Sequence, residues 1–204
     1  MKSQLILISG PSSSGKSTLA QAVYHSLDKK RTRLLALDNY YRDLRHLSPA
    51  ERAQRNFDEP NAWESERLLR EMQHLIAGHH IHMPRYDFNT HLRVDSTQII
   101  EPAPLIIAEG IFALCYPALN EIATLRIFVD IDDELALQRR LERDISARGR
   151  TQECITQQFN ATVRPANRKH IRPCCRNAHL VLNGCESTVS QLKLIQEYLH
   201  QIRT

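Results

Sequence analysis

The most informative stretch of the sequence reads Gly10-Pro11-Ser12-Ser13-Ser14-Gly15-Lys16-Ser17. Glycine, four residues, glycine, lysine and serine form the pattern of a phosphate-binding loop, the P-loop or Walker A motif. Such a loop curls so that its backbone N–H groups point at a phosphate chain, and Gly15 lets the backbone approach closely. Lys16 supplies a positive charge for the outer phosphates, and Ser17 supplies a hydroxyl for Mg²⁺.

The residues around this loop support that interpretation. Leu5-Ile6-Leu7-Ile8 is a short apolar run of the buried-strand type. After the loop, apolar residues recur at helical spacing at Leu19, Ala20, Val23 and Leu27. The alternative is a serine-rich surface turn in front of a helix. The length of the motif and its strand–loop–helix context favour the phosphate-binding loop, with the dipole of the helix adding to phosphate binding.

Composition limits the classes of protein that need to be considered. The chain has 204 residues, 42% of them hydrophobic, which predicts one α/β domain over residues 1–204. Its formal charge of +4 suits an anionic ligand, but an aromatic content of 6% does not favour a nucleic-acid-binding face. No apolar run reaches membrane-spanning length. We therefore expect small-molecule partners, without nucleic acid or membrane.

The N-terminus and the cysteines indicate a reducing compartment. The first ten residues lead directly into the phosphate-binding loop, so we do not expect a cleavable signal. The five cysteines are an odd number without paired spacing, which argues against a disulfide framework or a zinc site. A histidine cluster at residues 79–82 is better explained as a solvated loop. We expect a cytoplasmic protein.

Apolar runs alternate with helical stretches along the chain. The runs lie at residues 5–8, 33–37, 105–108, 124–129 and 180–182. This alternation predicts a P-loop-type α/β fold with a mostly parallel sheet flanked by helices. Residues 81–101 differ, since they read as short strands around a polar turn, and we expect them to form a small β-hairpin insertion over the ligand crevice.

Two acidic residues stand directly after predicted strands. Asp38 follows the second strand, and Glu109 follows the third. In an open α/β sheet, ligands bind beyond the carboxyl ends of the strands, where the phosphate-binding loop also lies. Glu109 is therefore placed to hold Mg²⁺. For Asp38, position alone leaves two interpretations open, an aspartate in a polar turn or a residue of the site.

Arginines gather in the segment 134–158. They are Arg139, Arg140, Arg143, Arg148 and Arg150, against the acids Glu142 and Asp144. Arginines on an exposed helix usually form a solvated face. Here their density and the glycine at position 149 favour a helical, arginine-rich lid that closes on phosphate, for which planar bidentate donors are well suited. We expect no catalytic residue beyond position 158.

Several ordered motifs together resemble the uridine kinase (uridine–cytidine kinase) family over about residues 4–183. They are Asp38-Asn39-Tyr40-Tyr41, Asn56-Phe57-Asp58 with Pro60, Pro84-Arg85-Tyr86-Asp87-Phe88 with His91 and Arg93, Glu109-Gly110-Ile111, Arg139-Arg140, Arg143-Asp144 and Arg148-Gly149-Arg150. The resemblance implies transfer of the γ-phosphoryl group of ATP or GTP, with Mg²⁺, to the 5′-hydroxyl of uridine or cytidine. It also leaves a homo-oligomer open, because family members are often tetramers.

The resemblance further implies a role for each matching residue. It implies that Asp38 orients and deprotonates the hydroxyl, with Lys16 and Arg143 completing the catalytic set. The implied Mg²⁺ site consists of Ser17, Asp38 and Glu109. Asp58 and Arg140 match the residues that hold the ribose hydroxyls, and Phe57, Tyr86 and His91 match the base pocket. The implied nucleoside site is completed by Tyr41 and Gln158. The implied donor-phosphate site is formed by Gly10, Pro11, Ser12, Ser13, Ser14, Gly15, Lys16, Ser17, Thr18, Arg148 and Arg150.

The chain departs from the family pattern at a few positions. Pro11 and Ser13 stand where the family usually has glycine, and Ser13 is expected to constrain a torsion that glycine adopts freely. Asn61 replaces a common acid, and His179 replaces the usual aspartate. Three alternatives stay open: a related kinase for pantothenate or a sugar phosphate, a catalytically silent nucleotide-binding protein, and a nucleic-acid-binding protein that uses the basic lid.

Overall fold

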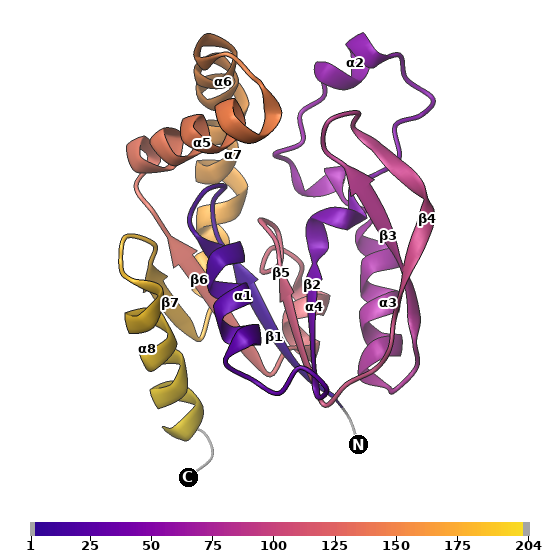
Figure 1. Ribbon diagram of the computed structural model, residues 1–204, viewed down its shortest axis with the longest axis vertical. Coiled ribbons are helices and arrows are strands. Elements are labelled where there is room, and N and C mark those ends of the chain that lie inside the picture. Colours follow the sequence, from indigo (N-terminus) through magenta and orange to yellow (C-terminus); the bar gives the residue numbers. More distant parts are fainter. Residues whose placement is uncertain (1–2, 202–204) are drawn as a thin grey trace.

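A parallel five-stranded sheet forms the centre of the protein, in the order β2-β5-β1-β6-β7 (Figure 1). The computed structural model describes residues 3–201 and, within them, all side chains except those of residues 53, 147, 148, 200 and 201. The strands are β1 (Gln4–Ser9), β2 (Thr32–Ala36), β5 (Leu105–Glu109), β6 (Leu125–Asp130) and β7 (Leu180–Asn183). The five predicted strands are thus confirmed to within one residue at each end.

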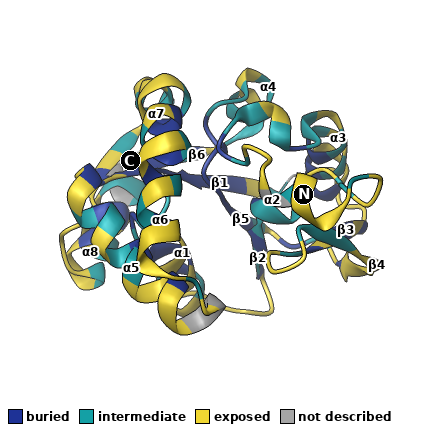
Figure 2. Cartoon of the chain, turned by 90° about the horizontal axis from the view of Figure 1, so that it is seen from above, coloured by how far each residue is buried: buried dark blue, intermediate teal, exposed yellow. Residues whose placement is uncertain are grey.

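The sheet is buried on both faces, which explains why its strands read as continuous apolar runs. Successive strand side chains point to opposite faces, so Leu5 and Leu7 join one core while Ile6 and Ile8 join the other. The first core also holds Leu68 of α3 (Ser65–Ile76), and the second holds Leu19 of α1 (Lys16–His25). Figure 2 shows these central strands in the buried colour beneath more exposed outer helices.

Helices cover both faces of the sheet. They are α1 (Lys16–His25), α2 (Pro49–Ala53), α3 (Ser65–Ile76), α4 (Pro117–Ile122), α5 (Asp133–Arg148), α6 (Gln152–Gln158), α7 (Arg164–Ala166) and α8 (Thr188–Gln201). α1 and α8 lie against one face, and α3 and α4 lie on the other (Figure 1). From α6 onward the chain stays helical to residue 177 but changes to π and 3₁₀ geometry. Pro165 and Pro173 lie in this run and lack the N–H that a regular α-helix requires.

The predicted insertion is an antiparallel hairpin of β3 (Ile81–Asp87) and β4 (Leu92–Ile100). Its pairing shifts register between Met83 and Arg85, around Pro84, which cannot donate a ladder hydrogen bond. Asn39 ties the hairpin to the end of β2, because its side-chain oxygen accepts from the Tyr86 N–H at 3.0 Å. The hairpin therefore stands beside the carboxyl edge of the sheet.

The strand order creates the crevice in which the site lies. β1 pairs with β5 on one side and with β6 on the other. The connection after β1 leads to β2 on one side of the sheet, whereas the connection after the neighbouring β5 leads to β6 on the other side. Ligands bind at such switch points in open α/β sheets. The loop at residues 10–17, the end of β2 and the end of β5 meet there.

Candidate active site

The loop between β1 and α1 adopts the curled backbone that its sequence predicts. Gly15 is the N-cap of α1 with φ +94°, and among the described residues no side chain caps the first N–H groups of the helix. Those N–H groups are left for an anion, together with the helix dipole. Ser13 has φ +65°, so a serine adopts the left-handed torsion that glycine adopts more easily, as expected from the sequence. Lys16 is 7% exposed.

A hydroxyl and two carboxylates converge at the carboxyl edge of the sheet. The Ser17 Oγ donates to Glu109 Oε1 at 3.0 Å. Glu109 Oε2 and Asp38 Oδ1 are buried and have no hydrogen-bond partner within residues 3–201. Buried acceptors without donors are costly unless a ligand satisfies them. This donor set fits a hard divalent cation, which takes one or two carboxylates together with substrate phosphates.

The same acids do not form a dedicated metal cage. Among the described residues there is no group of three or more histidine, cysteine or acidic side chains that could hold a metal ion. Mg²⁺ usually keeps several water or phosphate ligands, so it does not need such a cage. The arrangement therefore suits a metal that arrives with a nucleotide.

Asp38 is held in an environment that favours the neutral carboxyl group. Burial, followed by the nearby Glu109 carboxylate, raises the pKa of Asp38 to about 6, against the opposing effects of Lys16, the Ile111 backbone and Arg143. Gly110 makes room for this acid, since a Cβ there would lie 2.5 Å from the Trp63 ring and 3.2 Å from Asp38 Oδ1. An aspartate with a pKa near 6 is ionised at neutral pH and able to accept a proton.

The arginine-rich segment is organised by one buried acid. Asp144, which is 0% exposed, accepts from Arg143 Nε at 2.8 Å. Arg140 Nε and Arg150 Nη1 each lie 3.6 Å from Asp144 Oδ2. Gly149 ends α5 in the left-handed conformation at φ +61°, and the Arg150 N–H then returns to the Asp144 carbonyl at 3.2 Å. The chain turn thus brings Arg150 back beside the other arginines.

Gln158 joins two of these arginines. Its Oε1 accepts from Arg140 Nη2 at 3.2 Å and from Arg150 Nη1 at 2.8 Å. Arg140 also donates to the Ser12 Oγ at 3.2 Å, which connects the helical segment to the phosphate-binding loop. The side chain of Arg148, which was also expected to bind phosphate, lies outside the described part of the structure.

Asp58 lines the same cleft as Ser12, Lys16 and Ser17 of the phosphate-binding loop and is 8% exposed. The Thr162 Oγ1 donates to its Oδ2 at 3.1 Å. Burial raises the pKa of Asp58, while Arg140 and the Thr162 hydrogen bond act in the opposite direction. A buried carboxylate with so few donors is well placed to accept hydrogen bonds from two hydroxyls of a ligand.

Aromatic rings form one wall of the cleft. Tyr41 lies at the centre, with ring centroids 5.7 Å from Phe57, 5.3 Å from Tyr86 and 6.4 Å from Phe88. Phe57 and His91 are stacked, with centroids 4.4 Å apart and an interplanar angle of 14°. His91 has φ +57° at the tip of the β-hairpin, a conformation that directs the turn. Flat rings in a cleft of this kind suit a planar base.

Most of the predicted site residues share one cleft of about 690 Å³. They are Ser12, Lys16, Ser17, Asp38, Tyr41, Phe57, Asp58, Tyr86, His91, Glu109, Arg140, Arg143, Arg150 and Gln158. A second cavity of about 420 Å³ lies on the other side of Lys16 and Ser17 and is lined by the rest of the loop, Ser13, Ser14, Gly15 and Thr18. Gly10 and Pro11 face the protein instead: Pro11 is buried, and a Cβ on Gly10 would collide with the Val129 carbonyl oxygen.

The second cavity depends on a close approach of β7 to the loop. A Cβ on Gly184 would lie 2.5 Å from the Ser14 carbonyl oxygen, so only glycine fits there. Arg139 donates to the Gly184 carbonyl at 3.0 Å and lines this cavity together with Arg143. Lys16, Ser17 and Arg143 line both cavities, so two ligands can meet at these residues.

Sequence reasoning did not name Thr162, and it named Asn39 and Asp144 in motifs without giving either a role. Arg139 was expected in the arginine-rich lid, but not its contact with Gly184. For Asp144, the usable signal in the sequence was an acid placed among several arginines. A carboxylate that becomes buried needs a partner, and the arginines could supply it. Thr162 carried no signal, since its contact with Asp58 spans 104 residues of sequence.

Comparison with known proteins agrees with this arrangement. The model of the phosphoribulokinase/uridine kinase family matches residues 5–189. The uridine kinase of Chloroflexus aurantiacus is 39% identical over 180 residues, which cover 88% of this chain and 86% of the relative. The uridine kinase of Alkaliphilus metalliredigens is 39% identical over 175 residues, covering 86% and 84%.

A solved structure shares the fold. The phosphoribulokinase from Rhodobacter spheroides aligns with a TM-score of 0.68 at 18% identity, over 89% of this chain and 70% of that one. Within the part of the chain that the structure describes, no helix is both long and apolar enough to cross a membrane.

Proposed function

Since the chain belongs to the phosphoribulokinase/uridine kinase family and is a P-loop phosphotransferase, we propose that it phosphorylates the 5′-hydroxyl of uridine or cytidine. ATP, or GTP, is the proposed donor, and the products are UMP and CMP, as in pyrimidine salvage. One observation carries the proposal. A single cleft joins the phosphate-binding loop and Asp38 to an aromatic wall and a buried carboxylate, Asp58.

The phosphate-binding end of the cleft supports phosphoryl transfer. Such a transfer requires positioning and charge neutralisation more than covalent chemistry by the protein. Lys16, Arg143 and Arg150 supply positive charge around the transferred group. Ser17, Glu109 and Asp38 are the residues that would hold Mg²⁺, whose charge offsets that of the phosphates when it is bound. Closure of the lid would exclude water, which otherwise competes as the acceptor.

The acceptor end of the cleft supports a ribonucleoside. In this proposal Asp38 orients the 5′-hydroxyl and accepts its proton, while Asp58 binds the ribose 2′- and 3′-hydroxyls beside Arg140. Phe57, Tyr86 and His91 contact the base, and Tyr41 and Gln158 complete the pocket. A site built to hydrogen-bond a hydroxyl rejects a substrate that lacks it, because its buried polar group stays unpaired. The proposal therefore includes discrimination against 2′-deoxynucleosides.

A sugar-phosphate acceptor is supported less well by the same cleft. The two arginines that meet at Gln158 already have hydrogen-bond partners within the site, Arg140 with Ser12 and Gln158, and Arg150 with Gln158. The wall opposite them is aromatic rather than cationic. The compartment remains part of the proposal: free thiols at all five cysteines are compatible with a reducing cytoplasm.

A substrate panel tests the proposal. ADP release would be measured with Mg²⁺ and ATP on uridine, cytidine, their 2′-deoxy forms, adenosine, pantothenate and a pentose phosphate. We expect turnover on uridine or cytidine and at least tenfold lower kcat/KM on the deoxy forms. Turnover only on pantothenate or a pentose phosphate would overturn the substrate assignment while leaving the phosphotransferase assignment in place. Absence of ADP release on every acceptor would favour a silent nucleotide-binding protein.

A further inference from the structure

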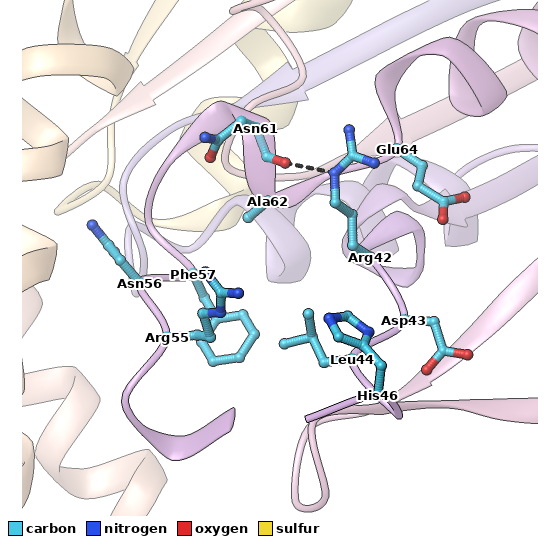
Figure 3. Close-up of a pocket in the computed structure, with 10 residues that line it drawn as sticks. All are labelled: Arg42, Asp43, Leu44, His46, Arg55, Asn56, Phe57, Asn61, Ala62 and Glu64. Carbon is cyan, nitrogen blue, oxygen red and sulfur yellow. Dashed lines mark hydrogen bonds between the residues drawn. The ribbon is translucent and has the colours of Figure 1, made fainter. Parts of the chain in front are cut away.

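A separate cavity of about 580 Å³ lies behind the nucleoside end of the cleft (Figure 3). Phe57 lines both hollows, so this ring is the wall between them. In Figure 3, Arg55 lies beside Phe57 on one side of the cavity, His46 and Leu44 lie on the other, and Arg42 lies above them. The volume is within the range of small-molecule sites, and none of the roles proposed above uses this cavity.

The charges around the cavity favour an anion. Arg42 and Arg55 form no ion pair with any residue in the range 3–201. Both carboxylates of the lining pair with arginines other than Arg42 and Arg55: Asp43 pairs at 2.7 Å with Arg45, which it shares with Asp95, and Glu64 pairs with Arg93 at 2.8 Å. Two guanidinium groups thus remain available, with the His46 imidazole beside them.

The remaining lining suits the organic part of a ligand. Phe57, Leu44 and Ala62 are half-buried apolar side chains, and the Asn61 side chain adds a neutral amide at the edge. Guanidinium groups bind phosphate in bidentate fashion, and a flat ring packs well on phenylalanine. A phosphate ester that carries a planar ring matches both features. We propose that this cavity is a second nucleotide-binding site, distinct from the cleft that holds the reacting groups.

The position of the cavity couples it to the acceptor site. On the cleft side, Phe57 is stacked on His91 with centroids 4.4 Å apart. The adjacent Asn56 accepts a hydrogen bond from the Asp58 N–H at 3.0 Å, and Asn56 lines the cavity of about 580 Å³ behind Phe57. An occupant therefore contacts Phe57 itself and Asn56, which holds the Asp58 N–H. Because Phe57 and Asp58 belong to the proposed nucleoside site, occupancy shifts the KM for the nucleoside more than kcat, an effect that rests on the proposed function.

The segment that follows Asp58 is held in place at residues 60 and 61, which makes the coupling specific. The Arg42 Nε donates to the Asn61 carbonyl at 2.9 Å, and the Tyr116 hydroxyl donates to the Pro60 carbonyl. Residues 60 and 61 are thus anchored, and the Phe57 carbonyl accepts from the Tyr41 hydroxyl at 3.2 Å, so we expect an occupant to act mainly through the side chains of residues 55–58. Within the described part of the chain the Arg55 side chain makes no such anchoring bond, so it is the cleaner position for mutation.

Binding of UMP to the full chain tests the site. The protein would be saturated with uridine and a non-hydrolysable ATP analogue, and UMP would be titrated by calorimetry. We expect a binding component that is weakened at least tenfold in Arg55→Ala, because one charge-assisted hydrogen bond to phosphate accounts for about a factor of ten or more. Arg42→Ala should weaken it similarly, whereas the exposed controls Arg31→Ala and Arg70→Ala should leave it unchanged.

The outcomes separate the two proposals. If UMP binds only by displacing uridine, the isotherms of wild type and Arg55→Ala will coincide, and the second site is overturned while uridine turnover stands. If uridine is not a substrate, the Arg55-dependent component still reports on the cavity. As a second measurement, UMP should change the KM for uridine more in the wild type than in Arg55→Ala. Without UMP, the two proteins should have equal kcat.

Discussion

Replacement of Asp144 by asparagine should destabilise the protein and disorganise its phosphate-binding arginines. Asparagine keeps the size of the side chain and one acceptor for Arg143 Nε but removes the negative charge. Among the described side chains, three guanidinium groups would then remain around a neutral group: Arg143 at 2.8 Å, and Arg140 and Arg150 each at 3.6 Å from the present carboxylate. The structure thus predicts two effects, one on stability and one on catalysis.

The magnitude follows from the burial of the groups. Removing one partner of a buried ion pair typically costs about 3–5 kcal/mol. Arg143 is 41% exposed and Arg150 is 27% exposed, so water screens their share, whereas Arg140 is 9% exposed. We therefore expect the lower end, about 3 kcal/mol, which corresponds to a decrease in Tm of about 6–12 °C for a domain of this size.

Urea unfolding followed by the fluorescence of Trp63 measures the stability, and steady-state kinetics measure the second effect. We expect kcat/KM for ATP to fall about tenfold or more, because the arginines lose the acid that preorganises them. Asp95→Asn is the matched control, since Asp95 is 89% exposed and pairs with an exposed arginine; it should change neither quantity. A stability loss below about 1 kcal/mol in Asp144→Asn with unchanged kcat/KM would refute the argument that this buried acid organises the lid.

Further predictions concern the cleft. Asp38→Asn should lower kcat by about 10²–10⁴-fold with little change in ATP affinity, because the acid acts on the acceptor; a variant with normal kcat would remove Asp38 as the base. His91→Ala should alter the ratio of kcat/KM for uridine and cytidine more than kcat on the better substrate, and an unchanged ratio would place His91 outside the base pocket. Burial raises the pKa of Asp58, so its folded-state pKa lies above the unfolded-state value and its ionised form destabilises the fold at neutral pH. Asp58→Asn should therefore raise the free energy of unfolding at pH 7, a gain that disappears as the pH falls through the folded-state pKa, and should raise the KM for the ribonucleoside; a loss of stability at pH 7 would contradict this.

The sequence was sufficient to predict the parts of the site that depend on local patterns. The phosphate-binding loop has a fixed spacing, and the acids Asp38 and Glu109 follow apolar runs directly, so their meeting at one sheet edge followed from the parallel arrangement. The hairpin was predicted because residues 81–101 read as short strands around a polar turn, and the structure contains it. In each case the signal lies within a few neighbouring residues.

The unpredicted parts depend on packing between distant segments. Thr162 reaches Asp58 only because the helical run after α6 folds back over the cleft, and nothing near Thr162 in sequence indicates this. Gly184 allows the chain after β7 to approach the loop at Ser14. In the sequence, residues 183 and 184 read only as an ordinary turn, so this contact could not be predicted. The cavity behind Phe57 likewise arises from residues on both sides of α2, whose positions depend on the anchored segment at Pro60 and Asn61.

The most direct measurement of the central claim identifies the product. Wild type and Asp38→Asn would be incubated with uridine, ATP and Mg²⁺, and the reaction would be followed by chromatography with mass detection. We expect uridine 5′-monophosphate and ADP in equal amounts from the wild type, and almost none from Asp38→Asn. Release of ADP without uridine 5′-monophosphate, or phosphate on another ribose hydroxyl, would contradict it.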